Sequence, residues 1–322
     1  MVVPVFNVYK HIGPALDSIR AQTIPPNEVI LIDDGSTDGS SEVLESYVGQ
    51  PGWSLIKISN NGLGPARNLG RLLAKSEYIY FFDSDDLLGK DFIERMYAVI
   101  EAESHPDLIM FSGKTFYDEG YSHPYFPDYQ RTITGQYSQY DHLLSTLSRH
   151  SEIWSQACLY LSKAKLWHEN RMFYPPVVHE DEAVLFPLIA LSQKTVVLKD
   201  VYFFRRIRAG SIMTSGIDER NVSGALRVLT ETMAFMASNG EVVYRDQEAW
   251  RVRVAQFGSY YVDACRHTRT KIAWYAVASS LLVARNFRYP FRLIFAFLPR
   301  HIRDCIRSIQ KTYWVRKEQQ RS

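Results

Sequence analysis

The chain has 322 residues and a formal net charge of +2, with 46% hydrophobic and 22% charged residues. This composition is ordinary for a soluble globular protein and excludes an intrinsically disordered chain. The three cysteines, Cys158, Cys265 and Cys305, form no CxxC or Cys/His ligand pattern, which argues against a structural zinc site and favours a reducing compartment.

Strand and helix patterns alternate along the first third of the chain. Continuous apolar runs predict strands over 2–6, 29–32, 55–58, 78–82 and 108–111. Helical spacing of apolar residues predicts helices over 8–22, 40–48, 65–75 and 91–102. Strands that are apolar throughout indicate a mostly parallel sheet with helices on both faces, and such sheets bind ligands at the carboxyl ends of their strands.

The rest of the chain changes character twice. Residues 116–150 are rich in Tyr, Asp, Gly, His and Pro, which predicts an excursion over the site, and an ordered stretch resumes over 153–168. From residue 217 onward, helical spacing predicts helices over 222–238, 247–267 and 271–285. We therefore expect an α/β domain over 1–216 followed by a helical C-terminal region over 217–322.

Three carboxylates follow directly on the predicted strand at 78–82. Asp83, Asp85 and Asp86 would repel one another unless a cation offset their charge. Hard cations such as Mg²⁺ and Mn²⁺ bind carboxylate oxygens together with substrate phosphates, so the run could be a metal site. An acidic loop before the next helix, with Asp83 or Ser84 as a turn former, would explain the same residues.

A second acidic pair, Asp33 and Asp34, follows the predicted strand at 29–32. Carboxylates there could accept hydrogen bonds from a nucleobase or from ribose hydroxyls. Ordinary turn chemistry between a strand and a helix uses the same residue types, and this pair by itself fits that explanation better.

The segment 61–70 contains glycines that permit a tight loop before a helix. Arg67 then lies near the helix start, where a guanidinium can bind a phosphate through two hydrogen bonds. An arginine facing solvent on this helix is the alternative.

Two further charged runs complete the set. The acids at 180–182 precede an apolar run and could supply a general base, or could simply favour a helix start. Spacing cannot choose among the three, because consecutive helical side chains point in different directions. The arginines at 205, 206 and 208 precede a Gly-Ser turn and could clamp a diphosphate, or could form a solvated basic strand.

Taken together and in this order, these segments resemble the family 2 glycosyltransferases with the GT-A fold. The resemblance covers about the first 215 residues and rests on the segments VPVFN, IDDGSTDGS, NGLGPARNLG, YIYFFDSDD, HEDE and YFFRRIRAGSI. It implies inverting transfer of a sugar from a nucleotide-diphosphate donor, commonly a UDP-sugar. The implied acceptor is a hydroxyl of a glycan or lipid-linked oligosaccharide in cell-surface polysaccharide synthesis, such as lipopolysaccharide or capsule.

The resemblance also implies residue roles. Asp181 would be the catalytic base that deprotonates the acceptor hydroxyl, and Asp85 would hold Mn²⁺ or Mg²⁺ on the diphosphate. The implied donor-binding residues are Pro4, Phe6, Asn7, Asp33, Asp34, Arg67, Asp83, Ser84, Arg206, Arg208 and Ser211. The chain lacks the QxxRW-type element of processive members, and no run of 18 apolar residues interrupts it, so we expect single additions.

Basic charge is concentrated at the C-terminal end. Residues 285–322 hold ten Lys/Arg against two acids, a net charge of about +8. Apolar residues alternate with this charge, which predicts peripheral attachment to an anionic membrane surface, with an amphipathic helix packed on the domain as the alternative. We expect a cytoplasmic protein at the inner face of a bacterial membrane and no nucleic-acid partner, and the sequence leaves a homo-oligomer open.

Two other functions are compatible with the fold class. A non-catalytic subunit that binds sugar nucleotides is disfavoured by the intact acids Asp83, Asp85 and Asp181. A sugar nucleotidyltransferase would carry a Gly-rich phosphate loop after its first strand, where this chain has residues 7–11, Asn-Val-Tyr-Lys-His. The donor sugar, acceptor and linkage depend on residues 113–180, where the resemblance is weakest.

Overall fold

The computed structural model describes residues 1–121, 126–211, 214 and 216–284. Contacts divide the chain into two compact units, Met1–Gly216 with Phe235–Ala249 and Ile217–Ala234 with Trp250–Ser322. The basic segment 285–322, on which the predicted membrane attachment depends, lies outside the described residues.

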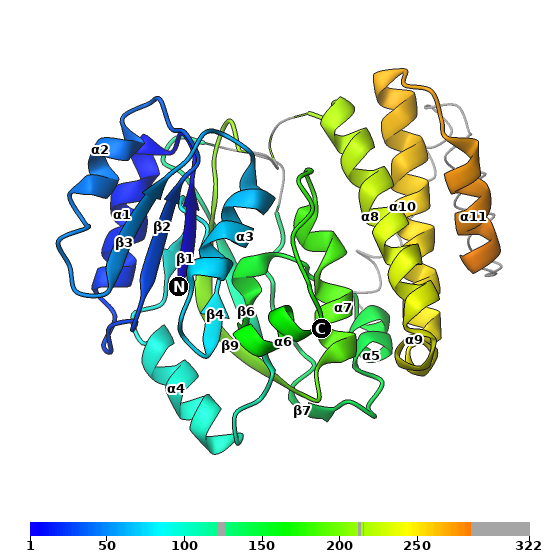
Figure 1. The fold of residues 1–322 in the computed structure, drawn as a ribbon, viewed down its shortest axis with the longest axis horizontal. Coiled ribbons are helices and arrows are strands. Elements are labelled where there is room, and N and C mark those ends of the chain that lie inside the picture. The colour runs from blue at the N-terminus through cyan, green and yellow to red at the C-terminus, as the bar shows by residue number, and fades with distance from the viewer. Residues whose placement is uncertain (122–125, 212–213, 215, 285–322) are drawn as a thin grey trace. The chain divides into compact units, whose positions relative to one another are not determined.

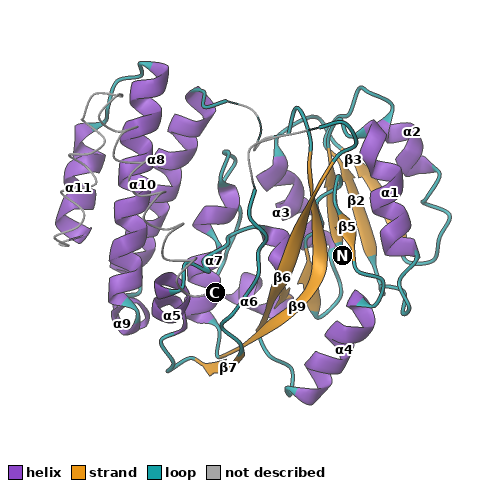
Figure 2. Ribbon diagram, turned by 180° about the vertical axis from the view of Figure 1, so that it is seen from behind, coloured by secondary structure: helices purple, strands orange, loops and turns teal. Residues whose placement is uncertain are grey.

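The first unit begins with a parallel three-stranded sheet. Its strands β1 (Val2–Val5), β2 (Val29–Asp33) and β3 (Trp53–Lys57) are connected by helices α1 (Tyr9–Arg20) and α2 (Ser40–Glu45). Successive side chains of a strand point to opposite faces. Val3 and Leu31 accordingly pack in one core cluster with α1, whereas Ile32 packs with Ala66 of helix α3 (Leu63–Leu73) in another. Helices therefore cover both faces, which explains the continuous apolar strands (Figures 1 and 2).

A second sheet continues the unit in the order β4-β8-β6-β9-β5, with β7 paired to β9. Its strands are β4 (Tyr78–Tyr80), β5 (Leu87–Leu88), β6 (Leu108–Tyr117), β7 (Gly135–Ser138), β8 (Tyr160–Lys163) and β9 (Lys194–Ile207). Only β6 and β9 run parallel, and the other pairings are antiparallel. This sheet thus contains more antiparallel pairs than the mostly parallel sheet that the sequence predicts. The pattern could not show this, because a strand buried on both faces has the same apolar content in either direction.

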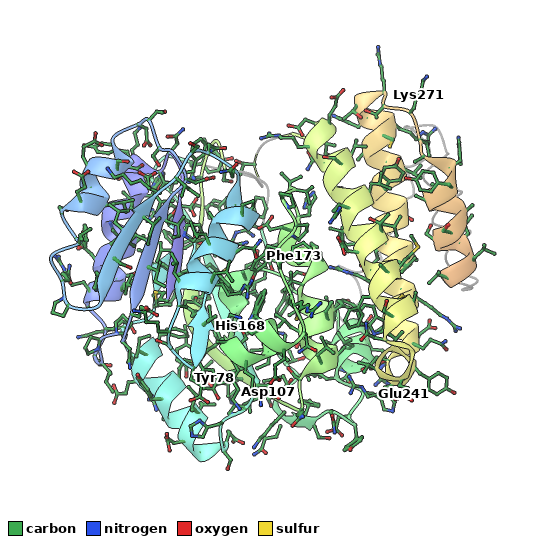
Figure 3. The ribbon with its side chains drawn as sticks, viewed as in Figure 1. Tyr78, Asp107, His168, Phe173, Glu241 and Lys271 are labelled. Atoms are coloured by element: carbon green, nitrogen blue, oxygen red, sulfur yellow. The ribbon has the colours of Figure 1, made fainter. Side chains whose placement is uncertain are left out.

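The two sheets meet where the predicted site lies. An isolated parallel bridge joins Val2 of β1 to Phe81, and the amide of Phe82 donates to the carbonyl of Val2 at 2.9 Å. The segment that follows β4 therefore lies at the same edge as the carboxyl ends of β1 and β2. Tyr78 and Asp107, at the amino ends of β4 and β6, mark the opposite edge (Figure 3).

Further helices and aromatic side chains complete this unit. The helices are α4 (Phe92–Ala102), α5 (Leu143–Arg149), α6 (Ala164–Glu169), α7 (Leu185–Leu191) and α9 (Gly240–Arg245), with 3₁₀ turns at Ala157–Leu159 and Glu180–Ala183. The ring of Phe92 lies 4.6 Å from that of Tyr80 and 5.3 Å from that of Phe111, measured between centroids. These aromatic contacts pack β4 and β6 against α4, so the acidic segment that follows β4 begins at a well-packed strand.

The C-terminal helices agree closely with the sequence pattern. They are α8 (Glu219–Ser238), α10 (Gln247–Thr268) and α11 (Trp274–Ala284). In the second unit Val222 of α8, Cys265 of α10 and Val277 of α11 belong to one core cluster. A search of the described residues finds no helix with the length and apolar content that crossing a bilayer requires.

Candidate active site

The two acidic segments of the predicted site are joined by a single arginine. Nη2 of Arg67 lies 2.6 Å from Oδ1 of Asp83, and Nη1 binds the Glu180 carboxylate. The Arg67 residue is only 2% exposed, and its guanidinium lies 5.3 Å from the ring centroid of Tyr174. Burial alone would lower the pKa of Arg67, but Asp83 and Glu180 raise this pKa well above its usual value. Arg67 therefore carries a permanent charge that holds the two acidic segments together, and its partner Glu180 lies 113 residues away in the chain.

This arrangement differs from the role that the resemblance implies for Arg67. Both ends of its guanidinium are occupied by carboxylates, and Nε has no hydrogen-bond partner. A direct contact with the nucleotide stays a prediction. The structure shows a buried residue that positions two acidic segments.

Helix α3 also holds the segment before Glu180 by its backbone. Nδ2 of Asn68 donates to the carbonyl of Tyr174 at 2.8 Å, and the amide of Tyr174 donates to Oδ1 of Asn68 at 2.9 Å. Gly64 permits this close approach, because a Cβ atom there would lie 2.5 Å from the carbonyl oxygen of Pro175 and 3.4 Å from Cγ of Glu180. The glycine predicted to shape a tight loop thus sets the distance between α3 and the acidic run.

Replacing Gly64 by alanine should lower the free energy of unfolding by about 1–3 kcal/mol, the usual cost of overpacking. The neighbour that must move is a backbone carbonyl, which cannot rotate away as a side-chain tip can. Urea unfolding measures the loss. The matched control is Gly13→Ala in α1, where a Cβ meets nothing within 4 Å and alanine is the better helix former. Equal effects of the two substitutions would contradict the close approach at Gly64.

Asp181 is distinguished from its two acidic neighbours by its partners. Glu180 is bound by Arg67, and Glu182 accepts a hydrogen bond from the Ser155 hydroxyl. Within the described part of the chain, the Asp181 carboxylate accepts only the amide of Glu182, at 2.9 Å. Asp181 is also half-buried, and burial together with the charges of Glu180 and Glu182 raises its pKa well above the usual value, against the opposing effect of Arg67. A carboxylate without a cationic partner and with a raised pKa is suited to accept a proton.

The three acids after β4 are held apart by different partners. Asp83 binds Arg67, Oδ2 of Asp85 lies 2.8 Å from Nε of Arg208, and Oδ1 of Asp86 accepts the main-chain amide of Arg206 at 2.6 Å. Asp86 is 4% exposed, and its pKa is raised by burial and by the charges of Asp85 and Asp83. Arginine side chains therefore offset the charges of Asp83 and Asp85, whereas Asp86 is held by a main-chain amide.

The donor atoms of this segment suit a hard divalent cation. Asp83 and Asp85 are half-buried carboxylates at the strand end, and Mg²⁺ and Mn²⁺ prefer such oxygen ligands. Among the described residues, Asp83, Asp86 and Cys158 have ligand atoms within 4.8 Å of one another. Burial and the nearby Asp83 and Asp86 raise the pKa of the Cys158 thiol well above its usual value, which disfavours the thiolate that a metal needs. The metal-binding role of Asp85 stays a prediction, and the carboxylates of this segment have the chemistry that such an ion requires.

The arginines at the end of β9 differ in how firmly they are held. Besides its amide contact, Arg206 donates from Nε to the carbonyl of Asp85 at 2.8 Å and from Nη1 to Oδ1 of Asp118 at 3.0 Å. Arg205 binds the hydroxyl of Tyr129, and its charge also acts on nearby Asp86. Ser211 forms a turn in which its amide donates to Oγ1 of Thr214 at 3.1 Å.

The acids after β2 stabilise loops in this structure. The Asp34 carboxylate accepts the amides of Asn61 and Gly62, each at 2.8 Å, and Asp33 accepts the amide of Ser36 at 2.9 Å and the hydroxyl of Ser41. Turn chemistry is thus present, as the alternative interpretation expected. Each carboxylate oxygen has a second lone pair, so recognition of a nucleobase stays a prediction.

The residues after β1 are partly available to a ligand. Phe6 is 46% exposed and Asn7 is exposed, whereas Pro4 lies buried within β1 and Ser84 is buried after β4. Asn7 has a left-handed backbone with φ 51°, and its Oδ1 accepts the amide of Thr37 at 2.8 Å. The Asp34 and Asn7 loops therefore lie beside an exposed aromatic ring.

Sequence reasoning missed several residues of this site. Asp118 binds Arg206 and lies 3.9 Å from Nε2 of His11, and Tyr174 and Asn68 fix the acidic run to α3. No local pattern could have found them, because each acts through a contact with a distant segment. Burial and the nearby Arg208 lower the pKa of His11, with Asp118 acting in the opposite direction.

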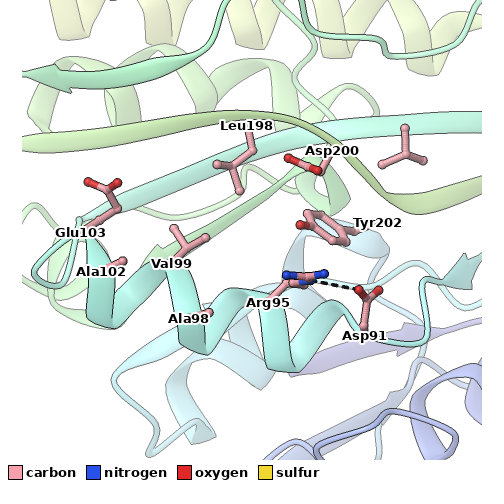
Figure 4. A pocket seen from close by; sticks show the side chains of 10 residues that line it. Asp91, Arg95, Ala98, Val99, Ala102, Glu103, Leu198, Asp200 and Tyr202 are labelled. Atoms are coloured by element: carbon pink, nitrogen blue, oxygen red, sulfur yellow. Dashed lines mark hydrogen bonds and ion pairs between the residues drawn. The ribbon is translucent and has the colours of Figure 1, made fainter.

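A separate groove lies between α4 and β9. It has a volume of about 540 Å³ and is lined by residues that include Asp91, Arg95, Leu198 and Tyr202, with Nε of Arg95 3.1 Å from Oδ2 of Asp91 (Figure 4). None of the predicted site residues lines it. The candidate site is therefore the strand edge around Arg67 and Asp85.

Comparisons with known proteins identify the family. A family model described as glycosyl transferase family 2 matches residues 1–150. The glycosyltransferase GlyG of Streptococcus pneumoniae is 31% identical over 230 residues, which are 68% of this chain and 73% of GlyG. The poly(ribitol-phosphate) beta-N-acetylglucosaminyltransferase TarS of Staphylococcus aureus is 27% identical over 67% of this chain, and the match spans only 36% of TarS.

Solved structures show the same fold. The structure of S. aureus TarS 1-349 in complex with UDP-GlcNAc has a TM-score of 0.59 at 20% identity and covers 88% of each chain. The mannosyltransferase PcManGT of Pyrobaculum calidifontis, in complex with GDP-Man and Mn²⁺, has a TM-score of 0.51 at 16% identity and covers 92% of this chain and 82% of that one. At these identities the likeness establishes the architecture, which confirms the predicted α/β GT-A class.

Proposed function

The chain belongs to glycosyltransferase family 2, and on that basis we propose that it transfers single sugars, with inversion, from a nucleoside-diphosphate donor to an acceptor hydroxyl. One observation carries the proposal. Arg67 ties Asp83, at the strand edge where a donor would bind, to Glu180, the neighbour of the proton acceptor Asp181. A donor site and a base must lie side by side for direct displacement, and this buried ion pair brings the two segments together.

The relatives support a class of donor and acceptor. The TarS structure holds UDP-GlcNAc, and TarS is named for transfer to poly(ribitol-phosphate). The exposed ring of Phe6, beside Asn7 and Asp34, offers a surface for a nucleobase such as uracil. We therefore propose a UDP-sugar donor and a glycan or lipid-linked acceptor of cell-surface polysaccharide synthesis.

The reaction follows from the positions of the charged groups. Asp181 takes the proton of the acceptor hydroxyl as its oxygen attacks the anomeric carbon from the face opposite the diphosphate. The bond from that carbon to the diphosphate oxygen breaks, and negative charge develops on the leaving group. Arg206 keeps the acidic loop in place through Asp85 and Asp118, and Arg208 supplies a nearby positive charge. A Mn²⁺ or Mg²⁺ ion held by Asp85 would neutralise charge on the diphosphate.

A panel of nucleotide sugars, offered with Mn²⁺ or Mg²⁺, tests this proposal. We expect binding of one donor and metal-dependent release of nucleoside diphosphate as it is consumed. Release of pyrophosphate from a sugar phosphate and a nucleoside triphosphate would instead show a nucleotidyltransferase. Donor binding without turnover on any acceptor preparation would favour a non-catalytic subunit.

The second unit suggests where the enzyme works. Helix α11 contains no charged residue, and its Trp274, Tyr275 and Leu282 are 58%, 69% and 72% exposed. The basic segment 285–322 follows it in the sequence. An exposed apolar helix that is followed in the sequence by basic charge fits an anionic membrane surface, where a lipid-linked acceptor would be found. We propose peripheral attachment at the inner face of a bacterial membrane.

Deleting residues 285–322 should lower co-sedimentation with vesicles that contain phosphatidylglycerol by about tenfold or more, since each basic residue near such a surface contributes about 1 kcal/mol. Neutral phosphatidylcholine vesicles serve as the control, and the full chain should bind them weakly. Undiminished binding of the shortened chain to anionic vesicles would refute attachment through this segment.

A further inference from the structure

Arg208 and Asp85 face each other in an ion pair at the proposed metal site. Nε of Arg208 lies 2.8 Å from Oδ2 of Asp85, and their side chains are only 16% and 21% exposed. In the proposed function, the arginine belongs with the diphosphate and the carboxylate belongs with the metal. We infer that Arg208 acts as a substitute cation at Asp85 in the free enzyme and moves to the diphosphate when donor and metal arrive. This exchange of partners makes metal and donor bind cooperatively. The inference rests on the proposed function.

The placement of the arginines shows which of them can move. Arg206 lies within β9 and is fixed by its amide, its Nε and its Nη1, which bind Asp86, the Asp85 carbonyl and Asp118. Arg208 is the first residue after β9 and starts a turn. Among the described residues its guanidinium has one hydrogen-bond partner outside its own turn, the Asp85 carboxylate, and it also reaches the carbonyl of Ala209 at 3.3 Å. One ion pair can be exchanged for another, whereas three anchored contacts cannot be released together at low cost.

The backbone and the side chain of Arg208 are held by different groups. Gly210 has φ 72°, and a Cβ atom there would meet none of the described residues within 4 Å. The Thr214 hydroxyl donates to the carbonyl of Arg208 at 2.9 Å, so this hydrogen bond holds the backbone of Arg208 and does not involve its guanidinium. Asp85 has no other cationic partner among the residues that the structure describes.

The exchange has a thermodynamic consequence. A divalent ion that binds alone must displace Arg208 from Asp85 and leave the guanidinium without a carboxylate. A diphosphate supplies a new partner for this guanidinium, so donor binding removes the cost of metal binding. Linkage then requires that the metal strengthen donor binding by the same factor, typically about 5–150-fold for coupled sites.

The test is a titration of Mn²⁺ into the full-length wild type and Arg208→Gln, with and without UDP, followed by the electron paramagnetic resonance signal of free Mn²⁺. Wild type should bind Mn²⁺ weakly alone and much more tightly with UDP. Arg208→Gln should bind Mn²⁺ alone about fivefold or more tightly than wild type, while its affinity for UDP falls. The tightening that UDP produces should therefore shrink in the variant.

Two further variants separate exchange at Asp85 from a general loss of positive charge. Arg205→Gln removes the same charge three residues earlier, from a side chain that lies near Asp86 but binds Tyr129 and forms no ion pair among the described residues, and should change Mn²⁺ affinity less than Arg208→Gln does. Arg208→Lys keeps the charge and should resemble wild type without UDP. An Arg208→Gln affinity for Mn²⁺ alone that equals that of wild type or of Arg205→Gln would overturn the inference. Failure of wild type to bind UDP at all would instead overturn the proposed function.

Discussion

Asp181→Asn should lower turnover by about 10²–10⁴-fold, the usual contribution of a general base, while binding of the donor is retained. Asparagine keeps the shape of the side chain but cannot accept the acceptor proton. Among the described residues, Asp181 is the carboxylate of its run that no arginine or hydroxyl binds, so its replacement leaves the ion pair between Glu180 and Arg67 in place. Release of nucleoside diphosphate measures turnover, and calorimetric titration of the donor measures binding.

Glu182→Gln is the matched control. This residue adjoins Asp181, but its carboxylate accepts the Ser155 hydroxyl, a hydrogen bond that a glutamine oxygen can also accept. We expect a much smaller loss of turnover. If Glu182→Gln were inactive and Asp181→Asn retained activity, the base would be Glu182.

The same base should govern the acid side of the pH profile. The pKa of Asp181 is raised by burial and by Glu180 and Glu182, and only the deprotonated form can accept a proton. Turnover should therefore rise with pH through a value above the ordinary aspartate pKa of about 3.9. This limb should be absent from the residual activity of Asp181→Asn, and a limb unchanged by the substitution would belong to another group.

Arg67→Met should lower the free energy of unfolding by about 3–5 kcal/mol, because it leaves a buried carboxylate without its counter-charge. Methionine fills much of the same volume, so the loss reports the charge rather than a cavity. Glu180 is the partner most affected, since its side chain is 7% exposed against 29% for Asp83. Urea unfolding measures the loss, and turnover should fall with it because the two acidic segments lose their link.

The control for Arg67 lies one helical turn further along α3. Arg71 is also buried and lies over the ring of Trp167 at 5.8 Å, but no carboxylate binds it in the described part of the chain. Burial lowers the pKa of Arg71, and Arg71→Met should be nearly neutral or stabilising. Adding Glu180→Gln to Arg67→Met should recover part of the loss, since the unpaired charge is then removed. No recovery in the double variant would mean that Arg67 acts through packing alone.

The strand ends were predictable, because an apolar run and the polar residues that follow it can be recognised within one short segment. Each strand predicted over the first 115 residues has a counterpart in the structure; Asp33 ends β2, Asp34 follows it, and Asp83 follows β4. The antiparallel direction of the buried strand β8 was not predictable, because a strand covered on both faces has the same composition in either direction. The excursion expected over 116–150 contains the end of β6, strand β7 and helix α5.

The sequence by itself determined the α/β class, the family and the groups that can bind a charged ligand, because these depend on residue type and spacing along one segment. Tertiary structure decided the partner of each charge. It placed Arg67 between Asp83 and Glu180 and Arg208 on Asp85, and among the described residues it left Asp181 without a cation. Two of these pairings, Arg67 with Glu180 and Arg208 with Asp85, join residues more than a hundred positions apart. Their geometry depends on how strands and helices pack, which no local pattern in the chain encodes.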